Sequence, residues 1–250
     1  MRISVELVPR TAESLEKELE LLRKQFPTVT TVNIPDLMRF PLRSWQACAI
    51  ARPFVANAIP HIRAIDIDLK RPLPMAAFLE KHDIREVIVV AGDAPVDMSR
   101  AVYSSSSLQV IRKFQVELPG IRVYAALDPY RQSFQKELAY AQDKLEAGAC
   151  GLFTQPFFDL RLMEIYADLL PNVEVFWGVT SVTSSKSLNY WQHRNKAVIP
   201  ADFEPTLGSS QQLAARALAF AKRRNANLYL MPIRTDLQSY LSSVLVQDTF

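Results

Sequence analysis

The chain contains only two cysteines in 250 residues, Cys48 and Cys150, and they do not stand at the spacing of metal ligands. A zinc site therefore has no support, and we expect no bound metal. A chain of this length can bury a substantial core without disulfides, so the scarcity of cysteine fits a reducing cytoplasm. The motifs HExxH, GxGxxG and GxxxxGKS/T are also absent, so zinc-protease and phosphate-loop chemistry lack support.

Long apolar runs are missing as well. No stretch approaches the roughly 20 apolar residues that cross a bilayer. The N-terminal MRISVELVPR leads directly into a strand pattern without an apolar signal region. We therefore expect no membrane insertion, no secretion and a cytoplasmic location. The formal net charge is only +3, and basic residues are interleaved with acidic ones, which disfavours a nucleic-acid partner.

The chain does contain a regular alternation of short β-prone runs with segments of helical periodicity. We predict strands over residues 3–8, 28–34, 59–67, 86–92, 121–128, 151–155, 173–180 and 227–233. We predict helices over residues 12–25, 43–57, 74–82, 106–116, 131–147, 159–169, 184–194, 209–223 and 235–246. Such alternation favours parallel strands, because each return to a parallel strand needs a crossover connection.

Eight strand-then-helix units in about 250 residues match the usual size of a (β/α)8 TIM barrel of the α/β class. The segment 209–223 is then an extra helix before the eighth strand. A doubly wound open sheet is the main alternative. No linker, low-complexity tract or shift in composition divides the chain, so we expect residues 1–250 to form a single barrel domain.

Polar side chains stand near the end of nearly every predicted strand. In a barrel these strand ends gather at one face, where functional residues are found. The set consists of Glu6, Asn33, Asp36, His61, Asp66, Asp68, Asp93, Asp128, Gln155, Thr180 and Arg234. Each of them alone is more often structural than functional, but together they predict a polar rim.

Glu6 and Asp93 are the most informative of these residues. In SVELV, strict alternation places Ser4 and Glu6 on one face of the strand. If that face is the barrel interior, burial raises the pKa of Glu6 and suits it to general-acid work. An outward edge position or a salt bridge is an equal alternative. Gly92 would let the backbone approach a ligand closely beneath Asp93, although a simple turn explains the pair as well. His61, taken alone, is typical of a structural histidine.

Four stretches carry a resemblance to a known family: SVELVPR, IPHIRAID, VIVVAGDAP and DKLEAGACGLFTQPFFD. The last is the most specific. FWGVTSVTSSKS and the VIP at 198–200 match more loosely. Over almost its whole length the chain resembles the catalytic barrel of methylenetetrahydrofolate reductase, the flavin enzyme of one-carbon and methionine metabolism. The resemblance implies hydride transfer from NADH or NADPH to FAD, and from the flavin to methylenetetrahydrofolate, which becomes methyltetrahydrofolate.

The resemblance also implies roles for individual residues. Glu6 matches the general acid that protonates the folate nitrogen as the methylene bridge opens to an iminium. Asp93 matches a carboxylate near the flavin that also faces the pterin. Gln155 matches the glutamine that hydrogen-bonds the pterin, Phe157 helps to wall the site, and Arg234 resembles an arginine at the substrate end of the last unit. Positions that match FAD contacts are Asn33, His61, Gly92, Glu137 and Lys144, with Lys144 suited to the diphosphate.

Several positions depart from the family pattern. Leu127 and Asp128 replace a tyrosine and proline, Ala91 replaces an arginine, and Ser185 replaces a stacking phenylalanine. The second strand also ends in NIPDLMRF rather than in threonine, tyrosine and glycine. Two interpretations follow. The chain is a divergent reductase with altered cofactor contacts, and a partner subunit is one source of its electrons. Alternatively, it is a protein with folate-type chemistry whose FAD binding is weakened or absent.

Two further hypotheses stay open. One is a non-catalytic folate-binding subunit that pairs with another oxidoreductase, and the second is a barrel enzyme with unrelated acid–base chemistry. The choice between NADH and NADPH is open because no dinucleotide fingerprint is present. The sequence allows a homo-oligomer or a partner subunit.

Overall fold

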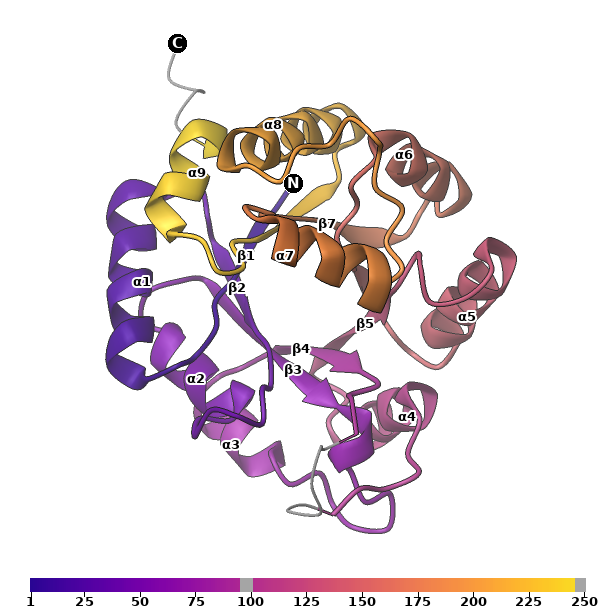
Figure 1. The fold of residues 1–250 in the computed structure, drawn as a ribbon. Coiled ribbons are helices and arrows are strands. Elements are labelled where there is room, and N and C mark those ends of the chain that lie inside the picture. The colour runs from indigo at the N-terminus through magenta and orange to yellow at the C-terminus, as the bar shows by residue number, and fades with distance from the viewer. Residues whose placement is uncertain (95–100, 246–250) are drawn as a thin grey trace.

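A computed structural model describes residues 1–94 and 101–245, and the strands of this part form a closed barrel (Figure 1). Each strand pairs in parallel with the next, and β1 closes the ring by pairing with β8. The strands are β1 (Ile3–Glu6), β2 (Thr31–Ile34), β3 (Asn57–Arg63), β4 (Glu86–Val90), β5 (Arg122–Leu127), β6 (Gly151–Thr154), β7 (Glu174–Thr180) and β8 (Asn227–Met231). The predicted (β/α)8 barrel is therefore confirmed, and the open doubly wound alternative is wrong because the sheet has no free edge.

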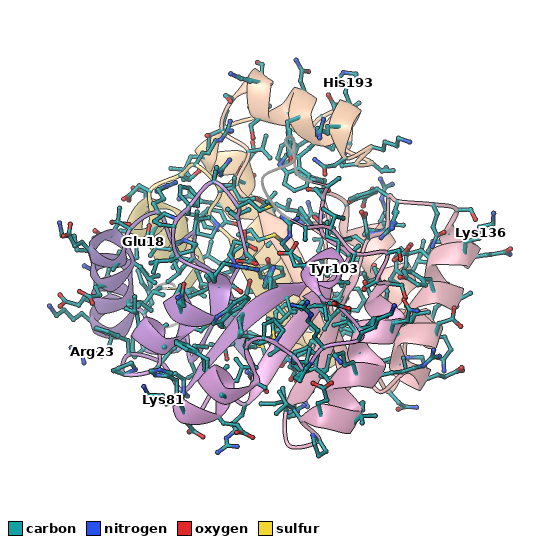
Figure 2. The ribbon with its side chains drawn as sticks, turned by 90° about the horizontal axis from the view of Figure 1, so that it is seen from below. Glu18, Arg23, Lys81, Tyr103, Lys136 and His193 are labelled. Carbon is teal, nitrogen blue, oxygen red and sulfur yellow. The ribbon has the colours of Figure 1, made fainter. Side chains whose placement is uncertain are left out.

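Apart from α7, which lies over the strands, the helices form a ring outside the barrel (Figure 1). They are α1 (Ala12–Gln25), α2 (Ser44–Ala51), α3 (Ala76–Lys81), α4 (Ser107–Glu117), α5 (Phe134–Glu146), α6 (Leu160–Leu169), α7 (Ser185–Asn189), α8 (Leu207–Arg224) and α9 (Leu237–Leu245), together with the short turns η1 (Ala64–Asp66) and η2 (Tyr190–Arg194). The extra helix before the eighth strand is confirmed as α8. The segment α7–η2 stands above the strands, at the end of the molecule that carries His193 in Figure 2.

Several predicted boundaries differ from the structure by a few residues, and two differ most. The predicted helix 43–57 is too long at its end, because α2 stops at Ala51 and β3 already begins at Asn57. Pro53 supplies no backbone N–H to a further helical turn, which explains the early stop. The predicted strand 59–67 gives way to η1 after Arg63. Residue 246 of the last predicted helix and Pro95 of VIVVAGDAP lie outside the described residues.

The helix α1 shows how local sequence fixes these elements. Thr11 and Ser14 form a reciprocal capping box that satisfies backbone donors at the helix start. Leu15, Leu19 and Leu22 recur every three or four residues, and all three are buried against the barrel. Burying each leucine stabilises the fold by roughly 1.5–3 kcal/mol. Through these leucines, α1 contributes to the outer layer of the core, which lies between the helices and the barrel.

A second cluster of side chains fills the barrel itself. Its members are Ile59, Ile88, Tyr124, Phe153, Phe176, Tyr229 and Met231. The rings of Phe153 and Phe176 stack with centroids 4.1 Å apart. The interior is therefore a packed core and not a pore, as in other barrels of this size.

The described residues lack two kinds of feature. None of the helices in residues 1–94 and 101–245 combines the length and apolar character of a membrane-spanning segment. In the same part of the chain, no three histidine, cysteine, aspartate or glutamate side chains come together in a way that could hold a metal ion.

Candidate functional site

Glu6 is the last residue of β1, and its side chain points into the barrel. Val5 and Leu7 belong to the outer core, as strand alternation requires, while the Glu6 carboxylate accepts a hydrogen bond from the hydroxyl of Tyr229 on β8. Tyr229 is itself a member of the interior cluster. Of the two alternatives for Glu6, the interior placement is therefore confirmed.

Burial raises the pKa of Glu6 to about 7, and the hydrogen bond from Tyr229 opposes that rise. Burial and the neighbouring carboxylate raise the pKa of Tyr229 as well, so the tyrosine keeps its proton and acts as the donor. A carboxyl group that titrates near neutral pH can both hold and release a proton under ordinary conditions. This is the property that general-acid catalysis needs.

The protein surface opens beside Glu6. The opening lies between the loops that follow β1, β2 and β8 and the helix α1. Its polar lining consists of Glu6, Arg10, Glu18, Arg39, Arg234 and Thr235. Arg234 has a φ of 54°, a backbone conformation that residues other than glycine rarely adopt. The predicted substrate residue Arg234 and the predicted acid Glu6 are thus brought to the same opening.

Ser4, Asn33 and His61 form a second polar group in the barrel. Nδ2 of Asn33 donates to the hydroxyl of Ser4 at 2.9 Å, and its Oδ1 lies 2.9 Å from Nε2 of His61. Burial lowers the pKa of His61 to about 4, so the ring is neutral near pH 7. With Asn33 Oδ1 as the acceptor, the proton of the neutral ring stands on Nε2. The carboxamide of Asn33 is buried and already has partners at both ends.

Gly92 and Asp93 follow β4, and their backbone is held by a residue that sequence reasoning missed. Nη2 of Arg63 donates to the backbone oxygen of Asp93 at 2.5 Å. Gly92 has a φ of 86°, and a Cβ there would lie 3.1 Å from Cβ of Arg63. Arg63 stands two residues after His61, so alternation along β3 could have placed it on the interior face. Asp93 itself is exposed at the rim.

Gln155 and Phe157 come directly after β6, but they point to different environments. Gln155 is exposed, and its backbone N–H donates to the backbone oxygen of Leu127 at 2.8 Å. Phe157 is fully buried and packs between strands and helices against Tyr166 and Trp177. The structure therefore does not bring Phe157 to the opening, because the chain turns outward after Gln155.

Asp159 caps the next helix. Its side chain accepts from the backbone N–H of Arg161 at 2.9 Å, directly before α6. Asp159 is therefore the N-cap of α6.

Glu137 and Lys144 lie on the face of α5 that packs against the strands, with exposed fractions of 1% and 4%. The ammonium of Lys144 donates to the backbone oxygen of Ala126 at 2.6 Å and lies 3.8 Å from Glu137. The Glu137 carboxylate accepts from the backbone of Asp128 at 3.1 Å and from Gln132 at 2.9 Å. Burial lowers the pKa of Lys144 to about 8. The pair holds the loop between β5 and α5.

These contacts test whether the residues predicted to bind FAD form a cofactor cradle. Asn33 and His61 bind each other inside the barrel, whereas Glu137 and Lys144 are buried behind β5. The space beside Gly92 is filled by Arg63 and Ile65, and not left free for a ligand. The five residues hold parts of this protein and do not converge on one surface. In this structure they do not fit FAD in the predicted arrangement.

Comparison with known proteins identifies the family to which the chain is related. It matches the model of the methylenetetrahydrofolate reductase family over residues 6–219. The 5,10-methylenetetrahydrofolate reductase of Escherichia coli K12 is 26% identical over 150 residues, which cover 58% of this chain and 51% of that protein. The enzyme of the same name from Buchnera aphidicola is 22% identical over 146 residues, or 56% and 50% of the two chains. The chain spans about half the length of the curated relatives it matches.

Solved structures of low sequence identity share the barrel. An uncharacterised protein from Clostridium thermocellum that binds two copies of 5-methyl-5,6,7,8-tetrahydrofolic acid superposes with a TM-score of 0.65 at 13% identity, covering 98% of this chain and 94% of that one. A 2,3-dimethylmalate lyase superposes with a TM-score of 0.60 at 9% identity, covering 94% and 75%. At such identities the likeness shows the fold alone. The family match is independent of it and covers most of the chain, from the predicted acid Glu6 to the extra helix α8. This chain therefore belongs to the methylenetetrahydrofolate reductase family.

Proposed function

We propose that this chain reduces 5,10-methylenetetrahydrofolate to 5-methyltetrahydrofolate with electrons from NADH or NADPH, as an oxidoreductase acting on a CH–NH bond in one-carbon and methionine metabolism. The observation that carries the proposal is Glu6. It combines a pKa of about 7 with a position in the lining of an opening that also contains the predicted substrate residue Arg234.

The role of Glu6 follows from the chemistry of the substrate. The methylene carbon of the substrate bridges two nitrogens, and it accepts hydride only after one carbon–nitrogen bond has broken. Protonated Glu6 donates to the leaving nitrogen, so the bond breaks and the carbon becomes an iminium on the other nitrogen. Hydride addition then gives the methyl group, and the Glu6 carboxylate takes a new proton from water through the opening. General-acid catalysis of this kind contributes about 10²–10⁴-fold in rate.

Two further groups are suited to hold the substrate. Gln155 is exposed at the end of β6, where its amide can both donate to and accept from a pterin. Asp93 is exposed at the end of β4, on a backbone fixed by Arg63. The names of the relatives and the folate bound by the Clostridium protein support a folate as the small-molecule ligand.

FAD is the carrier that the family implies, and because the five predicted contact residues bind parts of this protein, a flavin would be held by other residues. A second candidate function is a folate-binding or partner-dependent subunit of the same fold with weakened or absent FAD binding. The internal partners of Asn33, Glu137 and Lys144 favour this second candidate.

The test uses the purified chain and the variants Glu6→Gln and Glu18→Gln. The visible absorption spectrum, before and after incubation with FAD, reports flavin binding. The oxidation of NADH or NADPH in the presence of methylenetetrahydrofolate, with methyltetrahydrofolate measured as product, reports the reaction. We expect Glu6→Gln to lower product formation by about 10²-fold or more, with any flavin reduction by the nicotinamide retained.

Glu18→Gln is the matched control, because Glu18 lines the same opening but stands on α1, outside the barrel interior. It should keep the activity. Equal loss of both half-reactions in Glu6→Gln would contradict the acid role. Tight folate binding with no product under any of these conditions would contradict the reductase function and support the second candidate, a folate-binding or partner-dependent subunit.

A further inference from the structure

Gly92 lies between the end of β4 and Asp93, and both residues that flank it are held by the neighbouring part of the barrel. The backbone N–H of Ile65, in η1, donates to the backbone oxygen of Ala91 at 3.2 Å. On the other side, Nη2 of Arg63, at the end of β3, donates to the backbone oxygen of Asp93 at 2.5 Å. Glycine has more backbone freedom than any other residue. The direction of the Asp93 side chain therefore depends on these two bonds.

Arg63 is itself held by a series of alternating charges. Its Nε lies 3.4 Å from Oδ2 of Asp66, and the same oxygen accepts a hydrogen bond from Nη2 of Arg43 at 3.0 Å. Arg43 also donates to both carboxylate oxygens of Asp36, from Nε to Oδ1 at 3.0 Å and from Nη2 to Oδ2 at 2.6 Å. We call these four residues the charge chain. It joins the loop after β2 to η1 and to the end of β3, and its last bond reaches the backbone after β4.

The charge chain is shielded from water at both ends. The Asp36 side chain is 3% exposed and the Arg63 side chain 9%, and ion pairs of such low exposure are weakly screened by salt. Nε of Arg63 is buried and makes no hydrogen bond with the described part of the chain. Buried ion pairs can often be replaced by apolar residues without loss of stability. The retention of this buried guanidinium therefore points to a role beyond stability.

We propose that Arg63 is a positioning residue for the substrate, which holds the backbone of Asp93 so that the Asp93 carboxylate faces the pterin ring. The proposal rests on the proposed function, in which Asp93 binds the substrate, and adds the residue that orients it. A carboxylate can accept hydrogen bonds on both of its oxygens, and a pterin offers two adjacent N–H groups. Such a paired contact needs the carboxylate in one orientation, because small displacements of a positioning group weaken the contact strongly.

The experiment uses the full chain and measures its affinity for 5-methyltetrahydrofolate by calorimetry, together with kcat and KM for methylenetetrahydrofolate. The proteins are the wild type, Arg63→Met, Asp93→Ala and the double variant with both changes. Arg71→Met is the matched control. Arg71 also follows β3 and pairs with an aspartate, Asp68, at 3.5 Å, but its side chain is 81% exposed.

We expect Arg63→Met to weaken the binding of 5-methyltetrahydrofolate by about tenfold, as for the loss of one charged hydrogen bond. KM should rise while kcat changes little, which is the sign of a lost contact that ground state and transition state share. A general folding defect would instead lower the amount of active protein and so the apparent kcat. The double variant should bind no more weakly than Asp93→Ala alone, because Arg63 then has no carboxylate to position. Arg71→Met should bind like the wild type.

A milder variant keeps the test decisive if Arg63→Met fails to fold. Arg63→Lys retains the positive charge beside Asp66, but a single ammonium group lacks the planar fork that reaches Asp66 and the Asp93 carbonyl together. Its affinity should fall in the same direction by less than tenfold. This loss should also disappear when Asp93→Ala is added.

Three results would overturn the positioning role. One is a folded Arg63 variant with the folate affinity and KM of the wild type. Another is a double variant whose loss is the product of the two single losses, since Arg63 would then act independently of Asp93. The third is an Asp93→Ala protein that binds folate like the wild type. A wild type that binds no folate at all overturns the proposed function itself, so the two failures are distinct.

Discussion

The amino-terminal end of the barrel and the opening beside Glu6 differ in how their charged side chains are paired. At the amino-terminal end, Arg2 donates to both carboxylate oxygens of Glu86, at 2.9 and 2.7 Å. Glu174 accepts from Arg122 at 2.6 Å and from Asn227 at 3.1 Å. At the carboxyl-terminal end, Glu6 has Tyr229 as its hydrogen-bond partner, and the arginines of the opening have no acidic partner within ion-pair distance among the described residues.

The difference shows how one fold separates stability from chemistry. Apart from Arg2, which precedes β1, the charged groups of the amino-terminal network are first residues of strands, so their pairing fixes that end of the barrel. With that end satisfied, the other end can keep groups that lack full compensation. Glu6 has a raised pKa, and the arginines of the opening keep hydrogen-bonding capacity, which are properties of binding and catalytic sites. Substitutions at either end can test this division.

The largest expected effect is on stability, at the amino-terminal end. Arg2→Met removes the guanidinium that binds both carboxylate oxygens of Glu86, whose side chain is only 8% exposed, and leaves Arg122 at 3.5 Å and the hydroxyl of Tyr124 as its remaining partners. Because the buried carboxylate loses two charged hydrogen bonds, we expect the free energy of unfolding to fall by about 3 kcal/mol. Denaturant titration measures it. Folate affinity at the opposite end should not change.

Two further variants sharpen this test. Arg85→Met removes an exposed arginine one residue away, which pairs with exposed Asp83, and should change stability by less than about 0.5 kcal/mol. Adding Glu86→Leu to Arg2→Met should restore part of the loss, because no charge is then left unpaired. A double variant as unstable as the sum of both single ones would show that the network acts through packing and not charge.

The second prediction concerns Glu6, whose burial costs stability. Its pKa is about 7 in the folded state against an ordinary 4.5. The folded protein thus holds this proton more tightly than the unfolded chain. The resulting stabilisation is fully present below pH 4.5 and is lost as the pH rises through 7. Glu6→Gln imitates the protonated acid, so at about pH 8 it should be more stable than the wild type by about 3 kcal/mol.

Denaturant titration at about pH 5 and about pH 8 measures this effect, and the gain should fall below about 1 kcal/mol at the lower pH. His61 contributes the opposite trend, since its lowered pKa removes stability as the pH falls from 6.5 toward 4. That contribution is common to both proteins and cancels in the comparison. A pH-independent difference would mean that Glu6 is not buried as an acid. Greater stability together with lost activity would mark Glu6 as a group kept for function.

Much of the fold could be predicted from the sequence, and parts of the site could as well. The eight units follow from local periodicity, and the alternation in SVELV places Glu6 correctly inside the barrel. Tyr229 as its partner could not be predicted, because the two residues are 223 positions apart and meet only when β1 pairs with β8. The assignment of the arginines to one opening also needs the closed ring.

For two residues, the local sequence indicates a packing position that differs from the site role implied by the resemblance. Lys144 follows Glu137 and Ala141 at helical spacing, and this spacing puts all three on the buried face of α5. Phe157 follows Pro156, where the strand ends and its alternation no longer applies. The buried packing of both side chains depends on where an element ends and which face it buries. A family motif does not encode that information.

The third prediction tests the backbone support of the carboxyl-terminal end. In Gly92→Ala the new Cβ lies 3.0 Å from Cγ1 of Ile65 and 3.1 Å from Cβ of Arg63, on a residue whose φ is 86°. Both the crowding and the left-handed backbone disfavour alanine, so we expect a loss of about 1–2 kcal/mol in unfolding free energy and weaker folate binding. Gly120→Ala is the control, since no atom lies within 4 Å of its Cβ position. Equal effects of the two substitutions would contradict a special role of the Gly92 backbone.

The smallest expected effect concerns the single hydrogen bond to Glu6. Tyr229 lowers the pKa of Glu6 against the stronger effect of burial, so Tyr229→Phe should raise that pKa further. Glu6 acts as an acid in its protonated form, and the fall of kcat with rising pH should therefore move upward, by up to about one pH unit for a bond of about 1 kcal/mol. The measurement is the pH profile of kcat for the wild type and the variant. At low pH both should turn over at similar rates, because Glu6 is protonated in each. If the midpoint of the profile stays unchanged while the rate falls at every pH, Tyr229 acts through packing in the barrel core and not through the pKa of Glu6.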